Sequence, residues 1–337
     1  MAQYFTERLQ KVFHMIFTSY NQKMAQEGLR QLELIVNNQQ GPVQTDHRAL
    51  RNDMTTLLES DIDTKEDALK IANDPEAREL GDAYALLARV YAGPRFTWEE
   101  SNFPEDNMRT YQCLHDSIRR CSPIGTLQAL RIKGSITPTV EKDMQISFDD
   151  AFRIVYDHAD RGDAYCQYVI GNVFFWRDDN RISSAETMLT PPPMSWTKRI
   201  QQSLQGGSIH DRIAALQGTV PDEKLQENAS DLAKRWLNKA LYNGLAMFQG
   251  NLRNIYIDEA DFSNARRVAK TAAELGNPAM MLYTGLDCHE NGKFEDAFTW
   301  FTKGAALGQS ESIAELADYY YHFYDAKELR STIPYDP

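Results

Sequence analysis

The sequence predicts an all-α fold, an α-solenoid of antiparallel helix pairs, from three observations. The chain of 337 residues is longer than one small compact domain, which favours an elongated array. Hydrophobic residues make up 42% and aromatic residues 11% of the chain, enough to fill a core along most of its length. A turn pattern also recurs along the chain, and periods of about 30 to 47 residues are typical of helical-hairpin arrays.

The recurring turn is clearest near the C-terminus, where successive glycines lie 32 residues apart. At Gly276, the glycine can adopt the left-handed conformation that closes a helix, while Asn277 and Pro278 suit the start of the next helix. The predicted turns between hairpins lie at Gly81, Ser122, Gly162, Gly244, Gly276 and Gly308.

Capping boxes predict where the second helix of several units begins. The pattern S/T-x-x-D/E occurs at Thr64, Thr97 and Ser147, and each hydroxyl can accept a hydrogen bond from the first helical turn. After each turn the apolar residues fall at helical spacing. Small residues recur at one position, where they let neighbouring helices approach closely: Gly171, Gly285 and Ala317.

These motifs resemble the Sel-one-like repeat (SLR) family, a relative of the tetratricopeptide repeat. The best copies are GDAYCQYVIGNVFF at 162–175, GNPAMMLYTGLDCHENG at 276–292 and FEDAFTWFTKGAALG at 294–308. The resemblance is good over 232–325 and 147–175, weaker over 64–134, and absent elsewhere. It implies a right-handed superhelix that acts as an adaptor or scaffold and binds partners on its concave face.

The repeats divide the chain into five predicted segments: an N-terminal helical cap (1–60), a first group of repeats (61–180), an irregular insertion or degenerate repeat (181–230), C-terminal SLR repeats (231–325) and a tail (326–337). The N-terminal segment carries an aromatic stripe at helical spacing, which favours a cap on the first repeat over a dimer contact. The stripe comprises Tyr4, Phe5, Leu9, Val12, Phe13, Ile16, Phe17 and Tyr20.

A formal net charge of −12 argues against nucleic acid and anionic membranes as partners, because both repel a negative surface. A basic protein or peptide is the better candidate, and a homo-oligomer stays open. The N-terminus lacks the uninterrupted apolar core of a secretion signal, and no apolar run reaches the roughly 18 residues of a membrane span. The expected location is the cytoplasm, with reduced cysteines.

No residues form a recognisable catalytic constellation, so we expect no catalytic residues, no metal and no cofactor. The run 287–290 contains Asp, Cys, His and Glu, but adjacent helical residues point about 100° apart and cannot converge on one ion. His158 is expected to be partly buried and bonded to a carboxylate. The aromatic run 319–324 must pack partly on the last repeat, and its remaining side meets solvent, a tail or a partner.

The first helix of each hairpin lines the concave face in the proteins that this chain resembles. Counting seven and eleven residues from each turn predicts a groove that is aromatic and aliphatic with an acidic end, suited to a basic, hydrophobic peptide or helix. The predicted groove residues are Val169, Val173, Asn251, Ile255, Tyr283, Asp287, Glu315 and Tyr319.

The leading hypothesis is a non-enzymatic interaction module, an adaptor, regulator or neutraliser that binds one protein or peptide in this groove. One alternative is a self-assembling structural subunit that uses the N-terminal stripe and the tyrosine-rich end as contact faces. The other is an enzyme whose site lies in the 181–230 region.

Overall fold

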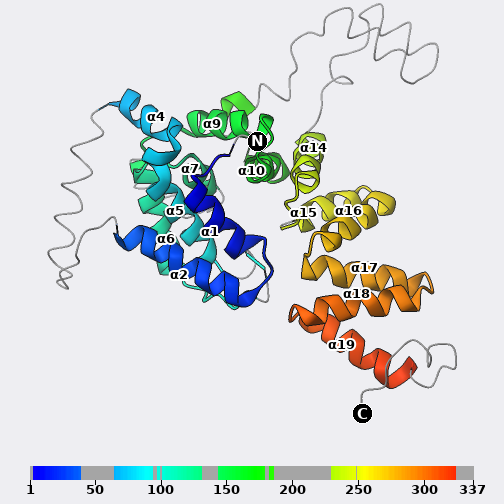
Figure 1. Cartoon of the computed structure of the whole chain (residues 1–337). Helices are drawn as coiled ribbons and strands as arrows, with labels where there is room; N and C mark the ends of the chain where they lie inside the picture. The colour runs from blue at the N-terminus through cyan, green and yellow to red at the C-terminus, as the bar shows by residue number, and fades with distance from the viewer. Residues whose placement is uncertain are drawn as a thin grey trace, which may run out of the picture.

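The computed structural model describes residues 3–38, 64–93, 97–98, 101–130, 143–178, 182–185, 229–247 and 249–323. Within these ranges the chain forms helices and no strands (Figure 1). The all-α prediction is therefore confirmed. The helices are α1 (Glu7–Phe17), α2 (Gln22–Asn38), α4 (Lys65–Asn73), α5 (Pro75–Tyr91), α6 (Asn107–Arg119), α7 (Pro123–Ala129), α9 (Phe148–Asp160), α10 (Ala164–Phe175), α14 (Ala229–Tyr242), α15 (Gly250–Asp258), α16 (Phe262–Glu274), α17 (Pro278–Glu290), α18 (Phe294–Ala306), α19 (Ser310–Asp318) and the π-helix η5 (Tyr319–Phe323).

Each helix packs against the helices next to it in the array. α10 lies between α9 and α14, α17 lies between α16 and α18, and α19 packs on α18. Figure 1 shows α14 to α19 stacked one after another toward the C-terminus. Because α14 packs directly on α10, the array continues across the 181–230 region. Most of that region, and the tail 326–337, lie outside the described residues.

The turn chemistry predicted at three hairpin junctions is confirmed. Gly162, Gly276 and Gly308 have φ values of +102°, +100° and +87°, the left-handed region that favours glycine. The residue after each glycine caps the next helix, as when the Asn277 side chain accepts a hydrogen bond from the Met280 backbone N–H. The 32-residue spacing thus marks real hairpin boundaries.

Two of the predicted turns are wrong in position. Gly81 lies inside α5, where a Cβ would come within 2.7 Å of the Arg120 carbonyl oxygen, so its small size serves close packing instead of a turn. The turn before α7 is made by Cys121, with φ +58°, and Ser122 is the cap of that helix. Helix α5 instead begins after Asp74, whose side chain accepts from the Glu76 backbone N–H.

At two helix junctions a glycine packs directly against a large apolar side chain of the neighbouring helix. A Cβ on Gly171 would lie 2.7 Å from the Leu237 side chain of α14, and a Cβ on Gly285 would lie 2.5 Å from the Phe301 ring of α18. Real Cβ atoms do not approach so closely, so glycine is required for these contacts. The role predicted for these two glycines is confirmed.

Gly285→Leu should lower the free energy of unfolding by about 1–3 kcal/mol, because the added side chain overpacks the junction with Phe301. Gly250→Leu is the matched control, since a Cβ on Gly250 meets nothing within 4 Å. Urea unfolding followed by circular dichroism measures both variants. Equal losses in the two variants would show that the junction is not tightly packed.

The N-terminal aromatic stripe is buried within the chain, each of its eight residues being at most 4% exposed. It reaches further than a cap on the first repeat. The rings of Phe5 and Phe13 lie 5.7 and 4.8 Å from the ring of Tyr165 on α10. The ring of Tyr20 lies against Gly276, at the start of α17. The N-terminal segment therefore links the first repeats to the C-terminal ones, and its buried stripe offers no contact face to a second copy.

A buried ion pair anchors the start of this N-terminal segment. Arg78 and Asp82, on α5, are 0% and 1% exposed, and the Arg78 Nε donates to Asp82 Oδ2 at 3.0 Å. The Arg78 Nη2 donates to the Tyr4 carbonyl oxygen at 2.7 Å, and its guanidinium lies 4.0 Å from the centre of the Tyr4 ring. Tyr4 and Ser122 donate their hydroxyls to Asp82. Burial raises the pKa of Asp82, and Arg78 opposes that rise.

His158 lies beside this ion pair and is partly buried, as predicted. Its ring meets the Tyr4 ring edge to face at 5.2 Å. We predicted a hydrogen bond between the His158 ring and a carboxylate. For the Nδ1 atom this is wrong, because His158 Nδ1 is buried and has no hydrogen-bond partner among the described residues. Burial lowers the pKa of His158, and Arg78 lowers it further. The folded chain therefore holds this imidazole in its neutral form near neutral pH.

Asp82→Ala should lower the free energy of unfolding by about 3–5 kcal/mol, because Arg78 would be left buried without its counter-charge. The double variant Arg78→Met/Asp82→Leu should lose less than the sum of its single variants. Glu27→Ala, which breaks the solvent-exposed pair with Arg30, is the control and should cost little. Additive losses at positions 78 and 82 in denaturant titrations would contradict coupling.

Acid should destabilise the chain through His158. Because burial lowers the pKa of His158 in the folded state, the unfolded chain binds this proton more tightly, and stability falls as pH drops below the ordinary histidine pKa of about 6.5. Melting temperatures recorded between pH 7.5 and 5.5 should therefore fall less for His158→Gln than for the wild type. Parallel curves would show that His158 titrates alike in both states.

Candidate partner-binding surface

Helices α15, α17 and α19 carry the groove residues predicted for the C-terminal repeats. Met281 of α17 and Ser312 of α19 both lie against Gly304 of α18, which brings these two helices together. Asn277 caps the start of α17, and Gln309 caps the start of α19. The turn chemistry of the repeats thus sets which side chains these helices turn outward.

Tyr283 is the most exposed apolar side chain among the predicted groove residues, at 38%. The guanidinium of Arg253, on α15, lies 3.9 Å from the centre of its ring, a cation–π contact that holds the ring in place. A fixed, exposed tyrosine ring offers a large contact area with little loss of side-chain entropy on binding.

Three polar groove residues also reach solvent in part: Asn251, Asp287 and Glu315. Asn251 donates to the Asn172 side-chain oxygen at 2.8 Å, which joins α15 to α10. Asp287 lies 3.4 Å from the Arg266 guanidinium of α16, a long contact. The structure therefore places Asn251, Tyr283, Asp287 and Glu315 where a partner can reach them.

The structure buries the other four predicted groove residues: Val169, Val173, Ile255 and Tyr319. Helix α10 is buried from Tyr165 to Phe174, because α9 and α14 flank it and the N-terminal aromatic residues cover Tyr165. Tyr319, 1% exposed, packs against Phe301, and its hydroxyl lies 2.7 Å from His289 Nδ1. Counting residues from each turn predicted that these four side chains face a partner. That prediction is wrong in this structure, because all four are buried.

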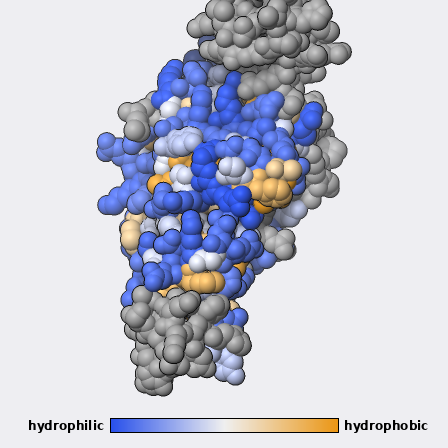
Figure 2. All heavy atoms as spheres, turned by 90° about the vertical axis from the view of Figure 1, so that its right-hand side faces the viewer, coloured by the Kyte–Doolittle hydropathy of each residue, from blue (hydrophilic) through white to orange (hydrophobic). Residues whose placement is uncertain are grey.

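The open helices carry a strong charge bias. Together α17 and α19 contain five carboxylates and no lysine or arginine. The five are Asp287, Glu290, Glu311, Glu315 and Asp318. Figure 2, the side of the molecule at the right of Figure 1, shows a mostly hydrophilic surface with small, separate apolar patches. Helices α17 and α19 therefore contribute only negative charge to this end of the array.

Exposed apolar positions on α19 were not predicted. Ile313 is 50% exposed, and Ala317 is also exposed. The repeat pattern assigned Ala317 to a helix junction, as it did Gly285. The repeat pattern carried no signal for this exposure, because it gives Ala317 the same position as the buried Gly285.

Chemical sites elsewhere are few in the part of the chain that the structure describes. No three His, Cys, Asp or Glu side chains gather there as metal ligands would. Burial raises the pKa of the Cys288 thiol, which opposes a reactive thiolate. None of the described helices is long and apolar enough to cross a membrane.

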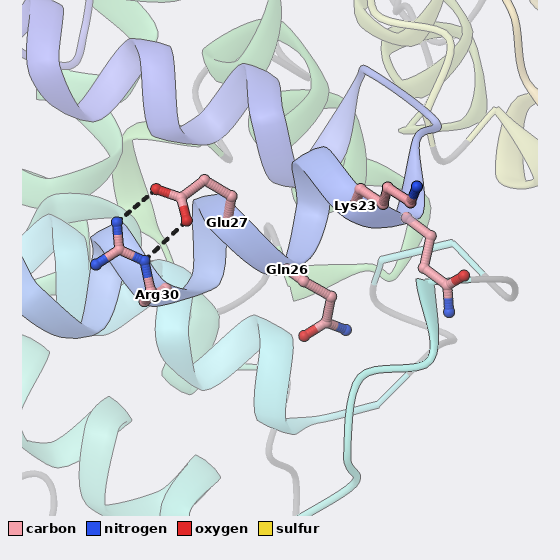
Figure 3. Close-up of a pocket in the computed structure, with 5 residues that line it drawn as sticks. Lys23, Gln26, Glu27 and Arg30 are labelled. Carbon is pink, nitrogen blue, oxygen red and sulfur yellow. Dashed lines mark hydrogen bonds and ion pairs between the residues drawn. The ribbon is translucent and has the colours of Figure 1, made fainter.

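A shallow hollow lies on one face of α2 (Figure 3). Its lining residues are Gln22, Lys23, Gln26, Glu27 and Arg30. Arg30 donates two hydrogen bonds to the Glu27 carboxylate at 2.8 and 2.6 Å, and this pairing lowers the pKa of Glu27 to about 2. Glu27 and Arg30 satisfy each other on the exposed side of one helix, so the hollow lacks the convergent polar groups of an active site.

No protein-family model and no curated protein matches the chain. Among solved structures, it is similar to a Sel1 repeat protein from Oxalobacter formigenes, with 13% identity over 78% of this chain and 83% of that one, and a TM-score of 0.34. It is also similar to a protective antigen present in uropathogenic Escherichia coli strains, with 14% identity over 85% of this chain and 61% of that one, and a TM-score of 0.27. That antigen displays an SLR fold, and both neighbours thus carry the repeat that the motifs of this chain resemble.

Proposed function

We propose that this chain is a non-enzymatic protein-interaction scaffold that binds a protein or peptide partner along α15, α17 and α19. The observation that carries the proposal is the exposed, cation-stacked Tyr283 on α17, a helix that, like α19, carries carboxylates and no lysine or arginine. Asn251, Asp287 and Glu315 are the other residues assigned to this surface.

The chemistry of the surface selects the class of partner. Arg266 of α16 contacts Asp287, but α17 and α19 themselves contribute carboxylates and no lysine or arginine, which favours a basic ligand. Tyr283 favours a ligand that also presents apolar or aromatic side chains. A net charge of −12 adds long-range attraction for such a ligand and repels nucleic acid and anionic lipid. A basic, amphipathic peptide or helix therefore fits this surface best.

Adaptor, regulator and neutraliser are three roles that such a surface can serve, and all three require the partner to be held. The cytoplasm remains the proposed location. An enzyme site in 181–230 falls almost entirely outside the described residues. Self-assembly through the N-terminal stripe is disfavoured, since those aromatic residues are buried in their own chain.

Affinity capture from the native cell extract should recover a protein with the wild type and lose it with Tyr283→Ala/Glu315→Lys. The matched control is Tyr242→Ala/Glu295→Lys, which makes the same two changes at exposed positions on α14 and α18. Circular dichroism checks that both variants keep their helicity. A partner that all three proteins recover equally well would place binding elsewhere on the chain.

A further inference from the structure

The short segment that precedes α1 is held between α5 and the α9–α10 hairpin. The Tyr4 backbone N–H donates to Asp163 Oδ2 at 3.0 Å, and the Tyr4 carbonyl oxygen accepts from Arg78 Nη2 at 2.7 Å. The ring of Phe5 stacks on the ring of Tyr165, on α10, with 5.7 Å between their centres. This segment therefore helps to bury an aromatic side chain of the first repeats, and Tyr165 is only 4% exposed.

His158 of α9 lies in this clamp, and histidine is the side chain whose charge changes near neutral pH. Its ring meets the Tyr4 ring edge to face at 5.2 Å, and its Nδ1 is buried without a hydrogen-bond partner among the described residues. A protonated imidazole carries a hydrogen on both ring nitrogens, so protonation would leave a buried, charged N–H at Nδ1 with no acceptor. Burying such a group costs more free energy than burying the neutral ring.

The titratable and charged groups around His158 and the Tyr4 ring come from the N-terminal segment, α5, α9 and the start of α10. They are Tyr4, Arg78, Asp82, Asp157, Arg161, Asp163 and Cys166. Burial is the main cause that lowers the pKa of His158, and Arg78 and Arg161 lower it further. Asp163 and Asp157 act in the opposite direction. A proton on His158 therefore adds a second positive charge near the buried guanidinium of Arg78.

Both costs are relieved if Tyr4 moves away, because water can then solvate the charged ring. The released state binds the proton on His158 more tightly than the docked state does. Docking therefore weakens as pH falls below the ordinary histidine pKa of about 6.5. Segments at the ends of a chain open at a lower free energy than the core, so this release does not require the array to unfold.

We propose that protonation of His158 releases the segment before α1 from α5, α9 and α10, while the helices of the array stay folded. The segment then acts as a pH-dependent cover, docked beside Tyr165 at neutral pH and lifted from it in mild acid. Its release gives the first repeats an accessible aromatic position. None of these residues belongs to the surface around Tyr283, so this proposal and the proposed function can fail independently.

Hydrogen exchange followed by mass spectrometry tests the release on the full chain. The reporters are the Tyr4 and Leu9 amides, which donate to the side chains of Asp163 and Thr6. After correction for the chemical exchange rate at each pH, the protection of these amides should fall several-fold, up to about tenfold, from pH 7.5 to 5.5. Fragments from α17 should keep their protection, because they lie outside the segment that is released.

His158→Gln should keep the same protection at both pH values, since its side chain stays neutral. His14→Gln, at an exposed position on α1, is the matched control and should respond to pH as the wild type does. Constant protection at Tyr4 and Leu9 in the wild type would overturn the proposal, as would an equal loss in α17, which indicates general unfolding. So would a His158→Gln chain that responds like the wild type, because Asp82 or another group would then carry the change. The wild-type comparison of the two regions needs no variant, so it stands as a test even if His158→Gln folds poorly.

Discussion

The ion pair between Arg78 and Asp82 is the interaction on which the N-terminal half of the structure depends. Burying two charges is costly unless each finds further hydrogen-bond partners. Arg78 finds the carbonyl oxygens of Tyr4 and Ala72, and Asp82 finds the hydroxyls of Tyr4 and Ser122. The pair is satisfied only when the N-terminal segment around Tyr4, α5 and the start of α7 come together. It therefore selects one arrangement of these three parts of the chain.

This arrangement decides which part of the array stays open. Once Tyr4 is held at α5, the apolar stripe of α1 runs past Tyr165 on α10 and ends with Tyr20 against Gly276. The stripe belongs to the main core that also holds α5, α10 and α14. The first repeats therefore bury much of their apolar surface in contacts within the chain, although Met108 and Tyr111 of α6 stay exposed, as do Tyr283 of α17 and Ile313 of α19.

The sequence predicts elements well where the chemistry is local. The turn at Gly276 followed by Asn277 needs only a residue that tolerates positive φ and a side chain that can cap, and both are readable from neighbouring letters. The prediction of a turn at Gly81 was wrong because glycine also allows helices to pack closely. That use depends on Arg120, which is 39 positions away in the sequence. The turn at Cys121 was misplaced by one residue because a left-handed cysteine carries no signal in the sequence.

The candidate site was half predictable for a related reason. Position in a helical repeat determines the direction in which a side chain points, and counting from the turn thus located Tyr283 and Glu315. It does not determine what lies in that direction. Val169 matches Tyr283 in position, yet it is 9% exposed because α10 is enclosed on all sides. Accessibility in such an array is set by contacts between distant segments, and the open positions are those that neither α1 nor a following helix covers.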